Sequence, residues 1–388
     1  MQLDRLEPMN GCGILGALKC VAGMPGLLPM IHGPVSCSSG HRLAMLYAGV
    51  EPLLPTTCIE QAQVVMGANE RLEAALERAW EAYRPELILV ILTCATAMTG
   101  EDAAAPLAEY ERRTGKRALL FDGSALAGDE VDAFPRVYAL FQEKFALTGG
   151  GADALALDGL ALTDYGFEVN WAALEKLFAT ATDVPLVRGL FAGCDLLTGG
   201  DAYRRARKLP TGLLWDGADL ASAAPIGVAG SWRFLCHVAG EAGLTLKSEA
   251  ERARDAFAAR VAPLAETIRR ADVRVGVEGA GWYAYALADF LKNELGAHVC
   301  MSVDRRANIP AGAVCDEFYE DTGRFELVEH FRAFGAQTVF GSSNVQLDEA
   351  WGYVPFYQPV WRVVEPVALL GYEAALALAQ RLAKGAGA

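Results

Sequence analysis

Three cysteines of this chain stand in settings where their thiolates could bind iron. Cys12 lies in the glycine-rich run Asn10-Gly11-Cys12-Gly13, Cys37 follows the turn-prone His32-Gly33-Pro34, and Cys94 closes an apolar run. Iron–sulfur clusters favour soft thiolate ligands, which can approach from separate loops. Scattered cysteines in an intracellular chain are also often small buried hydrophobic residues, so their spacing alone leaves both interpretations open.

Alternating strands and helices must position these cysteines. The continuous apolar run 87–92 predicts a strand covered on both faces, and 69–83 before it has helical spacing. The same reasoning predicts further strands at 117–121, 186–191, 273–279, 298–303 and 338–341, and helices around 107–113, from about 170, and over 283–295. Repeated βα units predict parallel sheets with ligand sites at the carboxyl ends of strands, where Cys94, Cys194 and Gly341 stand.

Composition narrows the class of protein. The chain has 388 residues and a net charge of −14, which argues against non-specific nucleic-acid binding. It contains no apolar run of about twenty residues, so we expect no membrane span. It also shows no export signal, so we expect a cytoplasmic protein with reduced thiols. Nine cysteines are an odd number, which argues against a full disulfide framework.

Several short motifs, most of them around the cysteines, are shared with one protein family. Residues 12–23 read CGILGALKCVAG, 28–37 read LPMIHGPVSC, and 85–94 read PELILVILTC with Gly100-Glu101-Asp102 after them. Residues 63–72 read QVVMGANERL, and 371–375 read GYEAA. They resemble the β-type subunits of the nitrogenase component 1 family, with C-x3-G-A-x2-C-x2-G, P-x2-H-G-x3-C, a strand ending in T-x-C, and G-Y-E-G-[AT]. The resemblance is strong over the first hundred residues and looser in the middle.

The resemblance implies an α/β fold with three Rossmann-like domains, whose parallel sheets are flanked by helices. We expect an N-terminal cluster-binding domain at 1–160, a second domain at 161–272 and a third at 273–388. It further implies that Cys12, Cys37 and Cys94 bind an iron–sulfur cluster, either [8Fe-7S] like a P-cluster or [4Fe-4S], shared with a partner subunit. The run Gly149-Gly150-Gly151 and the charged helix before Asp272 are candidate boundaries.

The function implied is that of a β-type subunit in a nitrogenase-like reductase. Its interfacial cluster would relay electrons from an ATP-dependent iron protein to a cofactor in a homologous α-type subunit, within an α2β2 heterotetramer. The chain has no G-x4-G-K-[ST] motif, so ATP chemistry must lie on another chain. The stretch 342–366 has no histidine, and Cys194 lacks an α-type context, so we expect no substrate cofactor and no catalytic residue here.

Departures from the family's sequence patterns indicate which branch of the family the chain resembles most. The chain starts close to Cys12, without the long extension of dinitrogenase β subunits, and it keeps all three cysteines, of which scaffold relatives typically lack one or more. These features favour a methylthio-alkane reductase, which cleaves carbon–sulfur bonds. The alternatives are a non-catalytic scaffold for cofactor assembly, a dinitrogenase β subunit, and a metal-free α/β binding protein with buried cysteines.

For most of the remaining candidate residues we expect a structural role. We expect Cys20 to be a core residue of a helix, His32 to shape its loop, and Asp102 to cap a helix. A part in the cluster site stays open for Cys58. Residues 275–281 predict a strand-to-helix turn instead of a dinucleotide loop, because the G-x-G-x-x-G spacing is incomplete. The cysteines of the later domains are expected to be structural: Cys194, Cys236, Cys300 and Cys315.

Overall fold

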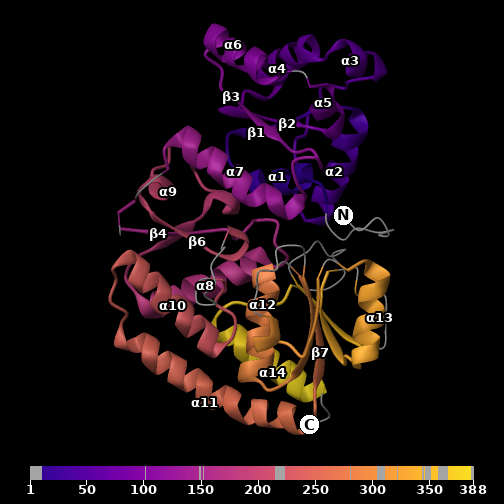
Figure 1. Ribbon diagram of the computed structural model, residues 1–388. Helices are drawn as coiled ribbons and strands as arrows, with labels where there is room; N and C mark the ends of the chain where they lie inside the picture. Colours follow the sequence, from indigo (N-terminus) through magenta and orange to yellow (C-terminus); the bar gives the residue numbers. More distant parts are fainter. Residues whose placement is uncertain are drawn as a thin grey trace.

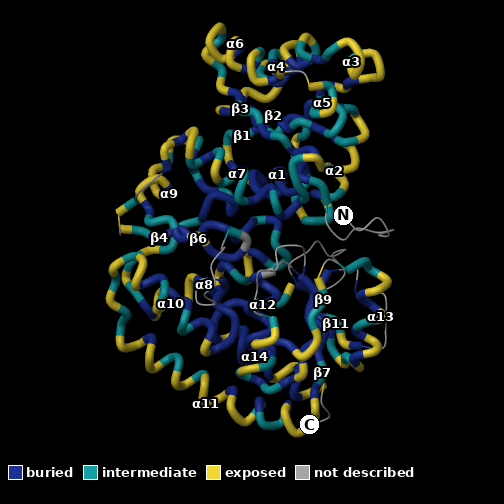
Figure 2. Tube along the Cα trace, viewed as in Figure 1, coloured by how far each residue is buried: buried dark blue, intermediate teal, exposed yellow. Residues whose placement is uncertain are grey.

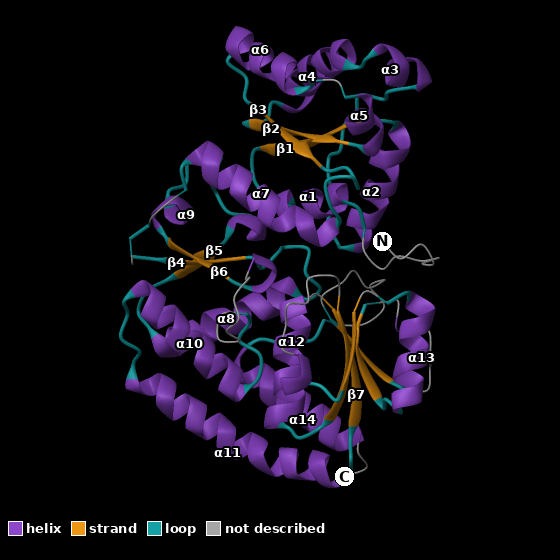
Figure 3. Ribbon diagram, in the orientation of Figure 1, coloured by secondary structure: helices purple, strands orange, loops and turns teal. Residues whose placement is uncertain are grey.

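Three parallel sheets, each flanked by helices, make up the molecule (Figures 1 and 3). The computed structural model describes residues 11–100, 102–147, 150–151, 153–214, 223–279, 281–303, 311–320, 322–342, 345, 351–356 and 366–385. The motif residues Asn10 and Glu101, Gly149 of the glycine run, and most of the stretch 342–366 lie outside these ranges. The predicted α/β class with parallel sheets is confirmed.

The N-terminal unit is built on a sheet of order β1-β2-β3. Its elements are α1 (Gly13–Val21), β1 (Leu27–His32), α2 (Val35–Tyr47), α3 (Gln61–Met66), α4 (Asn69–Tyr83), β2 (Leu87–Leu92), α5 (Cys94–Thr99), α6 (Ala104–Thr114), β3 (Ala118–Asp122) and α7 (Glu130–Phe145). The predicted helix 69–83 and strand 87–92 are confirmed at the predicted bounds, and the predicted strand 117–121 lies one residue further on.

The central strand β2 is buried on both faces because its side chains alternate between two helical layers. Leu87, Leu89 and Ile91 share one hydrophobic core with α1 and α7. Ile88 and Val90 pack on the opposite face, in a core with α4 and α6. This double cover explains why the strand reads as an unbroken apolar run in the sequence.

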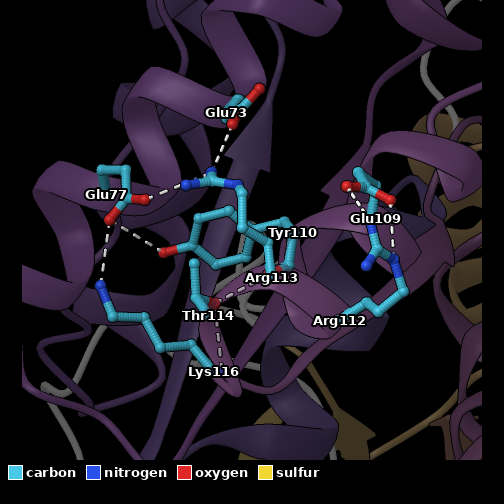
Figure 4. Close-up of polar contacts among 8 residues, drawn as sticks. All are labelled: Glu73, Glu77, Glu109, Tyr110, Arg112, Arg113, Thr114 and Lys116. Atoms are coloured by element: carbon cyan, nitrogen blue, oxygen red, sulfur yellow. Dashed lines mark hydrogen bonds and ion pairs between the residues drawn. The ribbon is translucent and has the colours of Figure 1, made fainter.

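A polar network braces the outer layer of this unit (Figure 4). Arg113 of α6 binds Glu73 of α4, and Lys116 binds Glu77 at 3.0 Å. The hydroxyl of Tyr110, whose ring is buried, donates to Glu77 at 3.3 Å. Exposed ion pairs of this kind each contribute roughly 0–1 kcal/mol, so packing of the apolar core holds α4 and α6 in place.

The middle unit has the strand order β5-β4-β6. Its elements are β4 (Leu155–Asp158), α8 (Phe167–Ala181), β5 (Leu186–Arg188), the 3₁₀ turn η1 (Leu190–Ala192), α9 (Ala202–Arg205), β6 (Arg207–Pro210), the 3₁₀ turn η2 (Gly212–Leu214), α10 (Val228–Ala242) and α11 (Ser248–Arg270). Because β4 pairs with β5 and β6, the boundary expected at residue 160 falls after the first strand of this sheet, and the glycine run 149–151 lies closer to the change of sheet.

The predicted strand 186–191 was too long. The ladder of β5 ends at Arg188, and the next residues form η1. The carboxylate of Asp158 accepts the N–H of Leu190 at 2.8 Å, which removes that donor from the sheet. Gly189 also passes so close to β4 that a Cβ would lie 2.2 Å from the carbonyl oxygen of Leu157. A side chain from the neighbouring strand therefore ends β5.

The C-terminal unit contains a five-stranded sheet of order β11-β10-β7-β8-β9. Its elements are β7 (Arg274–Gly279), α12 (Gly281–Asp289), the π-helical turn η4 (Phe290–Glu294), β8 (His298–Val303), the 3₁₀ turn η5 (Ala311–Ala313), β9 (Glu317–Glu320), α13 (Arg324–Phe334), β10 (Thr338–Gly341), β11 (Gly352–Pro355) and α14 (Gly371–Gly385). The predicted strands at 298–303 and 338–341 are confirmed, and β7 ends at Gly279 while α12 begins at Gly281, where we predicted a strand-to-helix turn.

One hydrophobic core cluster runs through all three units, and its buried residues are among those drawn in dark blue in Figure 2. Helix α14 packs on α8, α10 and α11, so the end of the chain returns to the middle unit. In the described part of the chain, no helix is both long and apolar enough to cross a membrane.

Candidate functional site

Each of the three predicted cysteines stands at the start of a helix. Cys12 is the N-cap of α1, Cys37 lies in the first turn of α2, and Cys94 is the first residue of α5. β1 and β2 pair in parallel, with His32 beside Leu92, so the turns into α2 and α5 leave the same edge of the sheet. The positive end of a helix dipole stabilises thiolates and other anions, so a helix start is a position where a cysteine can bind a metal as its thiolate.

Glycines allow these turns to approach one another. A Cβ on Gly33, in the turn before α2, would lie 2.2 Å from Cγ2 of Thr93, the residue before Cys94. A Cβ on Gly13 would lie 3.0 Å from the carbonyl oxygen of Gly123, in the loop after β3. The glycine-rich motifs therefore serve the close packing of the three cysteine-bearing segments.

His41 forms a pair with Cys12 that the sequence did not lead us to predict. Its Nε2 lies 3.1 Å from Cys12 Sγ, and its Nδ1 lies 2.6 Å from the carbonyl oxygen of Cys37. Burial acts to raise the pKa of the Cys12 thiol, but the hydrogen bond and charge of His41, with the N–H groups of Ile14 and Leu15, lower that pKa below its ordinary value. The thiolate of Cys12 is thus favoured.

Cys37 and Cys94 belong to the same electrostatic environment. Burial raises the pKa of the Cys37 thiol, and negative charge on Cys12 and Cys94 raises it further. Cys94 Sγ accepts the backbone N–H of Ala125 at 3.3 Å. All three thiols are only partly buried. Like charges brought together in this way are costly unless cations neutralise them, as iron would.

A buried hydroxyl beside Cys94 has no partner among the described residues. Ser124 is fully buried, yet its Oγ makes no hydrogen bond, whereas its neighbour Ala125 binds Cys94. An unsatisfied buried hydroxyl costs about 1–3 kcal/mol, so this position fits a site that a bound group completes.

The described residues place no three His, Cys, Asp or Glu side chains close enough together to hold a single metal ion. The donor set therefore does not fit a mononuclear site. Thiolates on separate helix starts fit a larger group, because the ligands of an iron–sulfur cluster bind different iron atoms.

A buried ion pair supports the cysteine-bearing helix α1 from behind. Lys19 of α1 binds Glu130 of α7, and both side chains are almost fully buried. The second carboxylate oxygen of Glu130 accepts the N–H of Gly11 at 3.0 Å, one residue before Cys12. Gly16 faces the same helix, because a Cβ there would lie 2.0 Å from the carbonyl oxygen of Glu130. These contacts fix the start of α1 relative to α7.

The structure bears differently on the predictions for the two other cysteines of the N-terminal unit. Cys20 is completely buried on α1, which confirms that it is a core residue. Cys58 is exposed and has a positive φ of 49°, in a loop where the N–H of Ile59 binds the carbonyl oxygen of Gly33. This loop therefore runs beside the turn before α2, and a role for Cys58 stays untested.

Polar residues near the site match their structural interpretations. His32 is buried and lies 3.0 Å from Oγ1 of Thr57, which also accepts the N–H of Gly33, so it shapes the loop as expected. Asp102 accepts backbone N–H groups at the start of α6, which confirms its capping role. His41 could have been found from its spacing, because a residue four positions after Cys37 lies on the same face of a helix.

A cavity lies beside α8 and is lined by residues of the middle and C-terminal units. Its lining includes Leu160 after β4, Tyr283 after β7 and Phe356 after β11, with Asp164 and Asn170 as polar members. The space open to water molecules is about 30 Å³. One water needs about 10–15 Å³ by this measure, so the cavity holds about two. None of the described residues that line it is a cysteine or a histidine.

Comparisons with known proteins identify the N-terminal unit by sequence. The family described as "Nitrogenase component 1 type Oxidoreductase" matches residues 12–157, which include all three cysteines. The nitrogenase molybdenum-iron protein beta chain of Clostridium pasteurianum is 27% identical over 135 residues, covering 34% of this chain and 30% of that relative. The corresponding chain of Klebsiella pneumoniae is 29% identical over 111 residues, covering 28% and 21%. The aligned part thus spans less than a third of either relative.

The fold is shared over the whole chain. A structure titled "Nitrogenase Cp1 at pH 6.5" superposes with a TM-score of 0.78 at 16% identity, covering 100% of this chain and 94% of that one. A second, titled "Nitrogenase Cp1 at pH 5", gives a TM-score of 0.67 at 13% identity, covering 99% and 90%. Residues 12–157 thus match the nitrogenase component 1 type of oxidoreductase, with nitrogenase β chains among the similar sequences, and the whole chain shares the fold of the solved nitrogenase structures.

Proposed function

We propose that this chain is the electron-relay subunit of a nitrogenase-like reductase, and that Cys12, Cys37 and Cys94 bind an iron–sulfur cluster at its interface with a second, α-type chain. The observation that carries this proposal is the position of the three thiols, each at a helix start. A bound cluster would take up and release single electrons. The residues of this chain would hold it by thiolate ligation and would stabilise its negative charge with helix dipoles.

Exposed apolar side chains in the cysteine-bearing unit support the proposal that a partner chain binds there. The described residues expose twelve large hydrophobic side chains, and nine of these lie in the N-terminal unit on α2, α3, α5 or the loops beside them: Val35, Leu43, Leu46, Leu53, Val64, Val65, Met66, Met98 and Leu126. We call these nine residues the apolar rim. A concentration of exposed apolar groups marks a binding surface, and here it lies in the unit that carries the three partly buried thiols.

Three thiolates from one chain leave part of a cluster to be bound by other ligands. A homologous α-type partner would supply them, whether the cluster is [8Fe-7S] or [4Fe-4S], and two such pairs would form an α2β2 heterotetramer. Electrons would come from a separate ATP-dependent iron protein, because this sequence has no P-loop motif. Cytoplasmic location follows as part of the same proposal, because thiols stay reduced there.

The substrate cofactor would belong to the partner. The cavity beside α8 has room for about two waters, and its described lining is mostly apolar. For the reaction, we propose reductive cleavage of the carbon–sulfur bond of methylthio-alkanes. Two electrons delivered through this chain, with two protons, would convert the thioether into an alkane and a thiol.

Single alanine substitutions test the cluster ligands. Cys12→Ala, Cys37→Ala and Cys94→Ala should each lower the iron and acid-labile sulfide content of the anaerobically purified complex and bleach its visible absorption. Cys236→Ala is the matched control, because that cysteine is exposed on α10 of another unit. Normal iron content in all three variants would end the proposal.

Turnover separates a reductase from a cofactor-assembly scaffold. The complex should reduce a methylthio-alkane when iron protein, ATP and a reductant are supplied, and Cys94→Ala should abolish electron transfer while the partner still loads its cofactor. A complex that holds a cluster but turns over no methylthio-alkane or dinitrogen would favour the scaffold.

A further inference from the structure

His41 is held by two contacts that fix which of its ring nitrogens is free to bind a metal. It lies four residues after Cys37, one turn further along α2. A carbonyl oxygen has no proton, so the 2.6 Å contact between Nδ1 and the Cys37 carbonyl oxygen is an N–H group donating to that oxygen. In the neutral ring, the other nitrogen, Nε2, then carries the lone pair. Histidines that bind metals are usually oriented by this kind of bond.

Nε2 faces a predicted cluster ligand from a different helix. It lies 3.1 Å from Cys12 Sγ, at the start of α1. One proton lies between these two atoms, on Sγ when both groups are neutral and on Nε2 when Cys12 is a thiolate beside a charged His41. Without that proton two acceptors would face each other, so a metal ion that binds both atoms would take the place of the proton.

We propose that His41 binds an iron of the same cluster through Nε2, so that this chain contributes three thiolates and one imidazole. This inference rests on the proposed function, because it concerns a ligand of the proposed cluster. Binding would release the one proton that lies between Cys12 Sγ and Nε2, and His41 would keep its Nδ1–H on the Cys37 carbonyl oxygen. Replacing a thiolate by a neutral imidazole raises the reduction potential of an iron–sulfur centre, so His41 would make this cluster easier to reduce than an all-thiolate one.

Pulsed EPR of the anaerobic complex, with its histidines labelled with ¹⁵N, tests this directly. In the oxidation state of the cluster that gives an EPR signal, the spectrum of the wild-type complex should show the coupling of a ¹⁵N nucleus that is bonded directly to iron. His41→Cys should keep the iron content, lose the nitrogen coupling and lower the midpoint potential, because a thiolate replaces the imidazole. His330→Gln, on α13 of the C-terminal unit, should keep both the coupling and the potential.

Two other results would overturn the inference and can be told apart. A wild-type cluster with full iron content but no directly bound nitrogen would rule out ligation by His41 and would leave the proposed function standing. A weak nitrogen coupling, from an N–H group that only donates a hydrogen bond to Cys12, counts as this result. A wild-type complex without iron or sulfide would remove both proposals. If His41→Cys does not fold, the labelled wild-type spectrum still decides between ligation and its absence.

Discussion

The chemistry of each cysteine depends on residues within one helical turn or one contact of it. Cys12 is a thiolate-favouring position because His41 and the first N–H groups of α1 outweigh its burial. The pKa of Cys37 moves the other way, because burial and two neighbouring cysteines raise it. Small residues matter equally at this scale, since Gly13, Gly16 and Gly33 permit approaches that a Cβ would block.

Two glycines in cysteine-bearing helices should respond oppositely to alanine. Gly16→Ala places a Cβ 2.0 Å from the carbonyl oxygen of Glu130 and 2.7 Å from Cβ of Ala133, so α1 must move away from α7. We expect the free energy of unfolding to fall by about 2–3 kcal/mol. Gly40→Ala, in α2, meets nothing within 4 Å and should raise it by up to about 1 kcal/mol, because alanine is the better helix former.

Urea unfolding of the two variants, followed by circular dichroism, measures this difference. Equal stability of Gly16→Ala and the wild type would show that α1 and α7 do not pack as closely as described.

At the scale of elements, long-range polar contacts decide where helices and strands begin, end and meet. Lys19 and Glu130 join α1 to α7 within a core that is otherwise apolar. Asp158, at the end of β4, accepts hydroxyl groups of Tyr138 from α7 and Tyr203 from α9, each at 2.9 Å. These contacts tie the N-terminal unit to the middle one.

Removing one partner of the buried ion pair should be severe. Glu130→Gln leaves the ammonium group of Lys19 buried without a countercharge, and we expect a loss of roughly 3–5 kcal/mol in the free energy of unfolding. The double variant Lys19→Met with Glu130→Gln should recover most of that loss. Glu109→Gln, in an exposed pair with Arg112, should change little. Denaturation midpoints compare the variants, and an unchanged midpoint for Glu130→Gln alone would show that the pair is not buried.

The carboxyl group of Asp158 should make stability depend on pH. Burial raises its pKa from 3.8 to about 6, although three hydrogen bonds and nearby Lys208 oppose that shift. The folded state therefore holds this proton more tightly than the unfolded state. Its contribution is complete below about pH 4 and disappears as the pH rises through 6, a change of about 3 kcal/mol.

The comparison with Asp158→Asn isolates this group. The stability of the wild type minus that of the variant should fall between pH 4 and pH 6 and stay level above pH 7. A difference that rose with pH would mean that the folded state prefers the charged carboxylate.

The sequence predicted those helices and strands whose bounds depend on the residues of the element itself. The unbroken apolar run predicted β2, and the helical spacing of apolar residues predicted α4. In both cases the pattern of buried side chains is contained within the element itself. The end of β5 could not be predicted, because it depends on the side chain of Asp158, 32 residues before Leu190. The cysteine motifs were visible, whereas the contact of His41 with Cys12 and the unpaired hydroxyl of Ser124 arise only from tertiary packing.

For the whole molecule, the uneven distribution of exposed apolar groups is the main feature. The N-terminal unit carries the cysteines and the apolar rim, and α3 within it exposes Val65 and Met66 by 81% and 85% (Figure 2). The described residues outside this unit expose only Val169 and Phe325 among large hydrophobic side chains. The N-terminal unit is therefore suited to bind other proteins.

A charge in the apolar rim should weaken partner binding without harming the fold. Leu43 on α2 is 50% exposed, so Leu43→Asp should leave the unfolding midpoint unchanged but weaken binding of the α-type chain by about 100-fold, because a carboxylate would be buried unpaired in the interface. Phe325→Asp on α13 is the matched control, since Phe325 is 64% exposed and lies outside the rim. Co-purification titrations compare the two variants, and equal binding by both would remove α2 from the interface.

The most direct test of the account is anaerobic native mass spectrometry of the wild-type chain produced with its α-type partner. We predict an α2β2 assembly whose mass includes iron and sulfide, and the loss of that added mass when the assembly separates into single chains, because the cluster is shared across the interface. A stable single chain that carries a complete cluster would contradict the account, as would an assembly that contains no iron.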